Sequence, residues 1–273
     1  MKIDPTLKTL IKAARAGGDA LLTYFGKELK HSQKSAHQGD YQTEADLTSE
    51  KIILEILQKE LPDYNIFSEE YGLIDKKSEY AITVDPLDGT HQFLLEIPHF
   101  GTLLSLRKGD IVQYGVIYEP ILNRITFAQK NKGAYQQTGN NPPIKLSVNK
   151  IKSIQKSTIY LIVAFQTLRR TIRRLQNSLF DANVKRILRP WTALVFTQLA
   201  SGKIEGAVSS DTELHDILAG KLICAEAGAQ ITHFGENIDT NPNFVLSNPQ
   251  IHKKLVEIVK PIFKKNHDHR RRI

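Results

Sequence analysis

The sequence predicts a mixed α/β protein of the α+β type, and three observations lead to this fold class. Apolar residues recur at helical spacing in two N-terminal segments, near residues 5–26 and 44–61. Residues 102–135 instead form short strand-like runs separated by turns, which indicates an antiparallel meander. Beyond residue 158, strand and helix patterns alternate, so the two halves of the chain are organised differently.

The two N-terminal helices are predicted from the periodicity of their apolar residues and from residues typical of helix ends. The first is expected to end near Gly26, and in the second Thr43 is expected to cap the first turn in a capping box with Asp46. The apolar stripes consist of Leu7, Leu10, Ile11, Ala14, Leu21, Leu22 and Phe25 in the first helix and of Ile53, Ile56, Leu57 and Leu61 in the second.

Six strands are expected in the middle of the chain. Pro86 is expected to end the second of them, because proline supplies no backbone donor. The segment 138–143 is rich in Gly, Asn and Pro, and it divides the chain into an N-terminal part, residues 1–142, and a C-terminal part, residues 143–273. The expected strands are residues 65–68, 80–84, 102–106, 112–118, 124–129 and 134–135.

The C-terminal part is expected to alternate strands with helices. Gly202 and Gly228 are expected to end two of these helices. The strands are predicted at 158–163, 183–188, 204–208 and 244–246, and the helices at 166–179, near 193–199, near 217–225 and at the end of the chain around Leu255, Ile258, Val259 and Ile262.

Composition and charge argue against a membrane, a secreted and a nucleic-acid-binding protein. The 273 residues are 41% apolar, enough for one large domain or two modest ones, and no segment is long and apolar enough to span a bilayer. The N-terminus lacks a signal-peptide pattern and Cys224 is the single cysteine, so we expect a cytoplasmic protein without an internal disulfide. The net charge of +8 is concentrated in residues 169–174 and 264–272. We interpret both as solvated surface, and a nucleic-acid partner is therefore not expected.

The stretch from Val84 to Phe93 is the most informative one. An apolar strand delivers Asp85 to its carboxyl end, and Asp88 follows across a tight turn. Gly89 and Thr90 then lead into a short helix whose first backbone N–H groups have no partner within the helix. Such a turn can bind cations and a phosphate together, although an ordinary Asx-Pro turn would use the same residues.

Acidic residues occupy three further positions at strand ends and helix starts. Asp46 begins the second helix, Glu69 and Glu70 follow the strand 65–68, and Asp216 begins a later helix. Hard divalent cations require several oxygen ligands, and this is an efficient way to concentrate them. Each residue also has a simpler interpretation, as a helix cap, a solvated charge or a favourable charge near a helix dipole.

Taken together, these segments resemble the inositol monophosphatase family in order and spacing. The motifs that carry the resemblance are Ser68-Glu69-Glu70, Asp85-Pro86-Leu87-Asp88-Gly89-Thr90, and Leu214-His215-Asp216-Ile217-Leu218-Ala219-Gly220 followed by Glu226-Ala227-Gly228. Weaker support comes from residues 41–46, 132–135 and 199–202. The resemblance spans nearly the whole chain, and the Asp-Pro-Leu-Asp-Gly-Thr motif is its most specific part.

This resemblance implies a layered αβαβα sandwich and a magnesium-dependent phosphomonoesterase with two or three Mg²⁺ ions, inhibited by Li⁺. Glu69, Asp85 and the carbonyl of Leu87 would bind the first metal, and Asp85, Asp88 and Asp216 the second. The implied catalytic residues are Asp46, Glu69 and Thr90, of which Thr90 and Asp46 would orient and deprotonate the attacking water. The implied substrate-binding residues are Asp88, Gly89, Thr90, Thr192, Ser209 and Asp216.

Three departures from the family pattern concern the substrate. His215 stands where the family usually has tryptophan, and we interpret it as a packed ring in preference to a hydrogen-bond donor near the second metal. Trp191, in the segment 189–193, adds bulk beside the expected sugar site, unless it fills core. Counting back from Asp216, Ser209 falls where the family has an acidic residue that meets inositol hydroxyls.

The family resemblance makes inositol 1-phosphate the default substrate, with release of inositol and phosphate, although a serine at position 209 weakens the case for inositol. Histidinol-phosphate, sugar-phosphate and 3′-phosphoadenosine nucleotide phosphatases of the same superfamily remain alternatives. A homodimer is implied by the resemblance alone. The competing class is a regulatory protein that keeps the scaffold and binds RNA through its basic surface.

Overall fold

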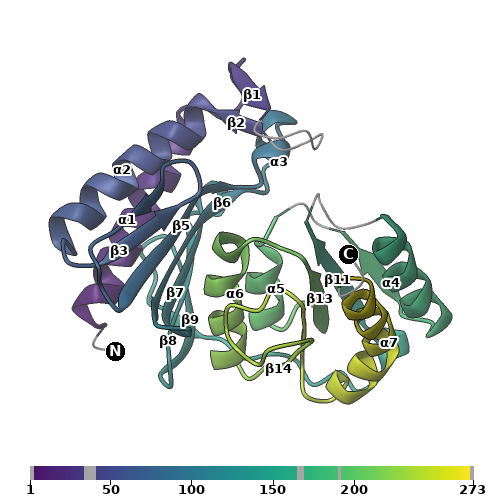
Figure 1. The fold of residues 1–273 in the computed structure, drawn as a ribbon. Coiled ribbons are helices and arrows are strands. Elements are labelled where there is room, and N and C mark those ends of the chain that lie inside the picture. The colour runs from purple at the N-terminus through teal and green to yellow at the C-terminus, as the bar shows by residue number, and fades with distance from the viewer. Residues whose placement is uncertain (1–2, 34–40, 165–168, 190–191, 271–273) are drawn as a thin grey trace.

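The molecule is built of five stacked layers, in the order helices, sheet, helices, sheet, helices (Figure 1). The computed structural model describes residues 3–33, 41–164, 169–189 and 192–270, and in the last helix side chains are described up to residue 263. The purple and blue helices α1 (Pro5–Leu22) and α2 (Glu44–Glu60) cover the outer face of the first sheet. The expected αβαβα sandwich is confirmed.

The first sheet has eight strands and contains the predicted antiparallel meander. Strands β5 to β9 pair with their sequence neighbours in antiparallel fashion, whereas β3 lies parallel to β5. In spatial order the strands are β10 (Ile144–Lys145), β9 (Gly133–Thr138), β8 (Arg124–Gln129), β7 (Ile111–Glu119), β6 (Gly101–Lys108), β5 (Tyr80–Asp88), β3 (Asn65–Ser68) and β4 (Gly72–Ile74).

The prediction that Pro86 ends its strand is wrong. Strand β5 continues to Asp88, because the register changes at this point: Asp85 pairs with Leu103 and Asp88 with Gly101. A β-bulge therefore takes Pro86 out of the ladder, where its missing N–H costs no hydrogen bond. The bulge also turns the chain so that the short helix α3 (Thr90–Leu94) can follow at once.

The second sheet has five strands in the order β12-β11-β13-β15-β14. Strand β11 is parallel to both neighbours, and β15 is antiparallel to β13 and β14. The bounds are β11 (Thr158–Val163), β12 (Arg186–Leu188), β13 (Gly206–Ser210), β14 (Gln230–His233) and β15 (Phe244–Ser247). The helices of this half are α4 (Arg169–Asp181), α5 (Val195–Ala200), α6 (Leu214–Glu226) and α7 (His252–Arg270).

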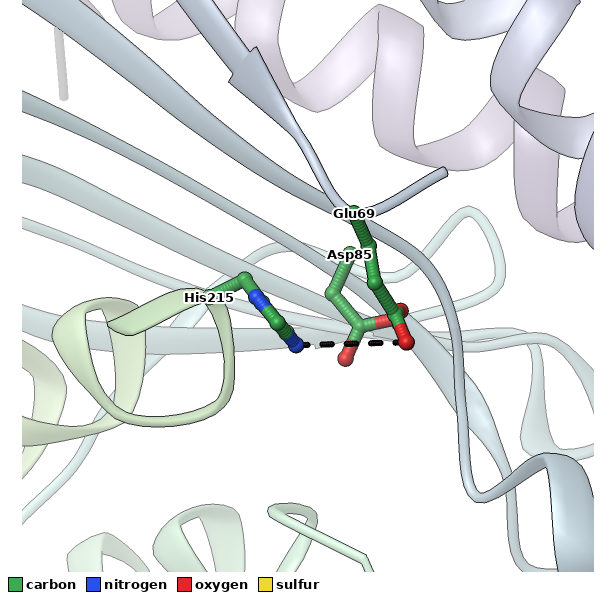
Figure 2. Close-up of side chains that lie close together, drawn as sticks. All are labelled: Glu69, Asp85 and His215. Carbon is green, nitrogen blue, oxygen red and sulfur yellow. Dashed lines mark ion pairs between the residues drawn. The ribbon is translucent and has the colours of Figure 1, made fainter. Parts of the chain in front are cut away.

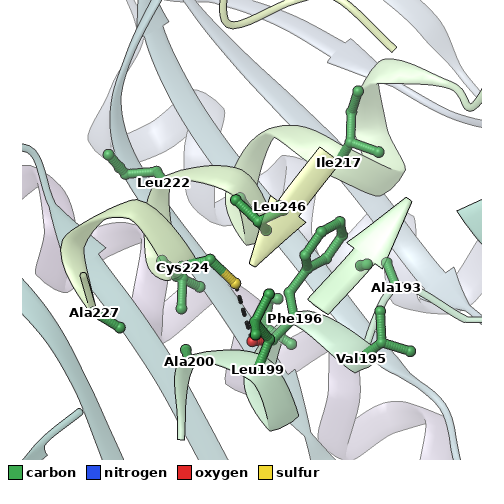
Figure 3. Close-up of a cluster of buried hydrophobic side chains, with 14 of the residues drawn as sticks. Ala193, Val195, Phe196, Leu199, Ala200, Ile217, Leu222, Cys224, Ala227 and Leu246 are labelled. Carbon is green, nitrogen blue, oxygen red and sulfur yellow. Dashed lines mark hydrogen bonds between the residues drawn. The ribbon is translucent and has the colours of Figure 1, made fainter. Parts of the chain in front are cut away.

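The largest apolar core lies between the two sheets. Helices α5 and α6 fill this middle layer, with Phe196 and Ile217 packed against Leu246 of the second sheet (Figure 3). Cys224 is fully buried here and its thiol donates to the carbonyl of Phe196 at 3.2 Å. A separate core on the far side of the second sheet is formed with α4 and α7.

The middle layer requires an unusually close approach of α6 to the first sheet. A Cβ on Gly115 of β7 would lie 2.6 Å from the carbonyl oxygen and 3.0 Å from the Cα of Ala219 in α6. Only a hydrogen atom at this position lets the two backbones approach so closely. Gly115 thereby sets how near the middle of α6 can come to the strands of the first sheet.

Other differences from the sequence prediction are confined to ends and short strands. Helix α1 ends at Leu22 and turns lead on to Gly26, and residues 165–168 and 190–191, with Trp191, lie outside the described residues. The sequence also did not predict β1 (His31–Gln33), β2 (Tyr41–Thr43), β4, β10, β14 and the 3₁₀ turns η1 (Pro120–Leu122) and η2 (Ile154–Lys156). These elements have two to four residues, too few for a periodic signal.

The division at residue 142 stays a prediction. Residues 144 and 145 still pair with β9 of the first sheet, and residues of both sheets share the middle core. Among the described residues no helix combines the length and apolar character required to cross a membrane.

Candidate metal centre

Acidic side chains from three distant segments meet at one edge of the first sheet. Because β3 and β5 are parallel, with Ser68 opposite Val84, the residues that follow them leave the sheet side by side. The N–H of Glu69 donates to the carbonyl of Val84 at 3.1 Å, which places Glu69 beside Asp85. The start of α6 approaches the same edge and brings Asp216.

The converging side chains form two groups of three possible ligands. One consists of Glu69, Asp85 and His215 (Figure 2), and the other of Asp85, Asp88 and Asp216. In each group the candidate ligand atoms all lie within 4.8 Å of one another. Asp85 belongs to both groups, which is the position that a residue bridging two cations requires. Carboxylate oxygens in this number suit hard divalent cations.

Electrostatic repulsion within the centre supports this fit. Burial raises the pKa of Asp85 well above its ordinary value, and the neighbouring charges of Glu69, Asp88 and Asp216 raise it further. Burial and the charge of Asp216 raise the pKa of Asp88 to about 7. Burial raises that of Asp216 to about 6, against the opposing effect of His215. Ionising carboxylates packed this closely costs free energy, and bound cations would offset that cost.

The carboxylate of Asp88 is also held by two residues of the segment before α5. The hydroxyl of Thr192 donates to its Oδ2, and the N–H of Ala193 lies 2.9 Å from Oδ1 and 2.8 Å from Oδ2. Both donors favour the ionised carboxylate and hold its pKa down, partly offsetting burial. The structure thus brings Thr192, an expected substrate-binding residue, into direct contact with an expected metal ligand.

Asp46 and Thr90 also come together as the resemblance implies. The capping box is formed: Asp46 Oδ2 accepts from the Thr43 N–H at 2.8 Å and from the Thr43 hydroxyl at 2.6 Å. Its other oxygen, Oδ1, lies 3.2 Å from the hydroxyl of Thr90, which is also 3.1 Å from the carbonyl of Leu87. Asp46 therefore completes the capping box of α2 and is at the same time a partner of Thr90.

Gly89 links the bulge to α3 and requires the left-handed region, with φ of 89°. A Cβ at this position would lie 3.1 Å from the carbonyl of His99 and 3.5 Å from Cβ of Thr192. Gly89 is also the N-cap of α3 and brings no capping side chain. The binding of phosphate to the N–H groups of Gly89 and Thr90 stays a prediction.

Two residues of α2 support the centre, and sequence reasoning missed both. The Ser49 hydroxyl donates to the carbonyl of Pro86 at 2.8 Å. Glu50, almost fully buried, accepts through Oε1 from the hydroxyl of Ser68, from the Glu70 N–H at 3.0 Å and from the Tyr71 N–H at 2.9 Å. The spacing of Glu50 from Asp46, four residues along one helix, could have indicated a shared face.

The His215 side chain is largely buried, as the preference for a packed ring expects, but its polar edge faces the centre. Its Nε2 points into the carboxylates, 3.4 Å from Asp216 Oδ1 and 4.0 Å from Glu69 Oε1. The first turn of α6 therefore presents two side chains to the centre. The neighbourhood of His215 and Asp216 at a helix start is the only sequence signal that could have suggested this.

Ser209 is fully buried in β13, and its hydroxyl is used within the fold. It lies 2.8 Å from the hydroxyl of Thr212 and donates to the carbonyl of Pro242 at 2.8 Å. Its contact with a substrate stays a prediction, as does the part of Trp191, which lies outside the described residues. The assignment of individual metal ligands also stays a prediction.

Known proteins resemble this chain over almost its full length. Nus factor SuhB of Pasteurella multocida is 29% identical over 268 residues, which cover 95% of this chain and 97% of the relative. A protein of Aquifex aeolicus named fructose-1,6-bisphosphatase/inositol-1-monophosphatase is 31% identical over 251 residues, or 91% of this chain and 92% of the relative. The relatives thus divide between two names with different functions.

Solved structures lead to the same fold. The extragenic suppressor protein suhB from Bartonella henselae matches with a TM-score of 0.85 at 28% identity, covering 94% of this chain and 99% of that chain. A sequence profile of the inositol monophosphatase family matches residues 2–264. With the Aquifex aeolicus relative, this match shows that the chain belongs to the inositol monophosphatase family.

Proposed function

We propose that this protein is a Mg²⁺-dependent phosphomonoesterase that acts on a small phosphorylated alcohol. The observation that carries the proposal is the pair of three-ligand groups that share Asp85. A phosphate monoester is a dianion, so the site must neutralise it, position an attacking water and stabilise the leaving alkoxide. Two adjacent cations held by Glu69, Asp85, Leu87, Asp88 and Asp216 would supply this Lewis-acid chemistry.

The protein's own groups have separate tasks in this reaction. Thr90 can accept a proton from water and pass its own to Asp46 Oδ1, because that oxygen lies 3.2 Å from the hydroxyl. Asp46 stays in place for this step because its other oxygen is held by Thr43. Thr192 and Ala193 hold the carboxylate of Asp88 through hydrogen bonds from their hydroxyl and N–H groups.

Inositol 1-phosphate is the substrate we propose first, since the family and several relatives carry this activity in their names. The Aquifex aeolicus relative is also named as a fructose-1,6-bisphosphatase, which supports sugar phosphates as an alternative. Histidinol phosphate and 3′-phosphoadenosine nucleotides complete the test set. We also propose a cytoplasmic homodimer, which light scattering would test, and inhibition by Li⁺.

A substrate panel with Mg²⁺ tests the proposal. Phosphate release from one of these compounds is expected, and Asp88→Asn should reduce it at least about 100-fold, since the centre loses a charge and a ligand. Asp110→Asn, an exposed carboxylate in the β6–β7 turn, is the matched control and should keep full activity. Well-folded protein that hydrolyses none of the panel, or an Asp88→Asn variant with full activity, would contradict the proposal.

A second candidate function is favoured by the relatives named Nus factor SuhB, at 26–29% identity. Under this proposal the chain binds RNA or another polyanion through the exposed Arg169, Arg170 and Arg173 of α4. Retention on RNA should then weaken steeply with salt, survive Asp88→Asn and be lost when these three arginines are changed to glutamine. Absence of retention at low salt would remove this candidate.

A further inference from the structure

The two ligand groups of the centre differ in chemistry. Asp85, Asp88 and Asp216 offer oxygen alone, whereas the group of Glu69, Asp85 and His215 offers two oxygens and an imidazole nitrogen. Both groups draw on the first turn of α6, since His215 and Asp216 are neighbours there. In Figure 2 the His215 ring comes from α6 and approaches Glu69, which directly follows β3, and Asp85 of β5.

The separation between His215 and Glu69 matches ligands of a common cation. Nε2 of His215 is 4.0 Å from Glu69 Oε1, longer than an N–H···O hydrogen bond of about 3 Å, and the candidate ligand atoms of Glu69, Asp85 and His215 all lie within 4.8 Å of one another. Ligand atoms at about 2.1 Å from one octahedral cation lie about 3 Å apart in cis positions and about 4 Å apart in trans positions. The side chain is 12% exposed, so the ring is held within the centre.

Accepting the proposed metal centre, we infer that His215 is a nitrogen ligand of the cation bound by Glu69 and Asp85, and that it makes this position prefer first-row transition-metal ions over Mg²⁺, with Mn²⁺ as the probe that spectroscopy can follow. Mg²⁺ favours an all-oxygen shell and retains its waters, whereas imidazole suits borderline first-row metals. The group of Asp85, Asp88 and Asp216 has no nitrogen and keeps the selectivity of an oxygen site. The two cation positions therefore differ in metal preference.

Metal binding without substrate tests this inference. Electron paramagnetic resonance of the Mn²⁺ complex should show coupling to a ¹⁴N nucleus in the wild-type protein. This coupling should disappear in His215→Gln, which keeps a polar side chain, and in His215→Phe, which keeps a packed ring. Competition titrations should show the preference for Mn²⁺ over Mg²⁺ falling about 10- to 100-fold in both variants, the range seen when groups that tune a metal site are lost.

Two controls define the origin of the signal. His233→Gln, in the edge strand β14, should leave the coupling and the preference unchanged. Asp85→Asn removes the ligand shared by both groups and should abolish Mn²⁺ binding at this centre. Thermal melting of the metal-free variants shows whether they fold. If His215→Phe does not fold, the nitrogen coupling and the metal preference of His215→Gln test the inference.

A wild-type Mn²⁺ complex with oxygen ligands alone would overturn the inference, and so would an unchanged metal preference in His215→Gln. In that case His215 serves as a hydrogen-bond or ion-pair partner of Glu69 and Asp216. The proposed function fails separately. Nitrogen-bound Mn²⁺ without phosphatase activity would contradict the phosphatase alone, and turnover without nitrogen coupling would contradict the role of His215 alone.

Discussion

At the scale of single residues, the centre depends on groups that hold its carboxylates in place. Asp88 illustrates this most directly, because it is only 6% exposed and has close donors from another segment of the chain. Without Thr192 and Ala193, burial and the charge of Asp216 would raise its pKa further. A buried carboxylate that binds a metal must be ionised, so these donors favour metal binding.

Thr192→Val tests this effect, because it removes the hydroxyl that donates to Asp88 and retains the size of the side chain. We expect the affinity for Mg²⁺, measured by titration calorimetry without substrate, to fall about tenfold. Thr192→Ser keeps the hydroxyl and should restore most of the affinity. Equal affinity in the valine and serine variants would show that the hydrogen bond does not support the metal centre.

At the scale of elements, α2 is the helix that organises the acidic loops. Three residues within one and a half turns reach separate parts of the centre: Asp46 reaches Thr90, Ser49 reaches the bulge at Pro86, and Glu50 holds the turn after β3. Because Glu69 lies in that turn, the position of a candidate metal ligand depends on a buried acceptor in another helix. This dependence is a long-range contact of eighteen to twenty-one residues in sequence.

Glu50→Ala should therefore leave the Ser68 hydroxyl and two backbone N–H groups without their acceptor, costing about 1–3 kcal/mol of stability. Metal affinity should fall about 10- to 100-fold as well. Glu50→Gln retains one acceptor oxygen, so its losses of stability and of metal affinity should be smaller. Glu55→Ala, exposed on the same helix, is the control. A variant that melts earlier but binds metal normally would restrict Glu50 to a role in the fold.

Helix α6 is the second such element, and its approach to the sheet depends on Gly115. Gly115→Ala should destabilise the protein by about 1–3 kcal/mol, measured by denaturant unfolding, because the new Cβ meets the backbone of Ala219. Since φ at Gly115 is outside the left-handed region, the effect is steric. Gly115→Ser should cost more. Displacement of α6 should also weaken metal binding, because His215 and Asp216 would move away from Asp85. Unchanged stability in both variants would contradict this account.

At the scale of the whole molecule, the buried carboxylates link stability to pH and to metal. Asp88 has a folded-state pKa of about 7 against an ordinary value of 3.8, so between about pH 4 and pH 7 the folded protein binds a proton that the unfolded chain has released. Asp85 shifts in the same direction, and Asp216, whose side chain is about a third exposed, contributes less. Rising pH therefore removes stability from the metal-free protein.

As the pH rises from about 5 to 8, the unfolding free energy of the metal-free protein should fall by an amount on the order of a few kcal/mol. Its melting temperature should fall accordingly. Saturating Mg²⁺ should raise the melting temperature more at pH 8 than at pH 5.5, because the cation competes with protons for the same oxygens. Asp88→Asn should flatten the pH dependence without metal. An equal effect of Mg²⁺ at both pH values would contradict the linkage.

The sequence by itself determined the local elements and the candidate ligands. Periodicity and the capping box predicted α1 and α2, the strand runs predicted the meander, and motif spacing identified Glu69, Asp85, Asp88 and Asp216. Periodicity, the capping box and the strand runs are short-range signals, since each depends on residues within one helix or one strand. The order of the motifs along the chain was sufficient to suggest the family, which the profile match then showed.

Only the tertiary structure decided how these residues meet. The bulge at Pro86, the parallel pairing of β3 with β5 and the close approach of α6 at Gly115 all depend on partners far away in sequence. Other long-range contacts turn His215 toward Glu69, bury Ser209 against Pro242 and place Thr192 against Asp88. Periodicity contains no information about such contacts, because the packing of layers and the burial of charge are properties of the assembled molecule.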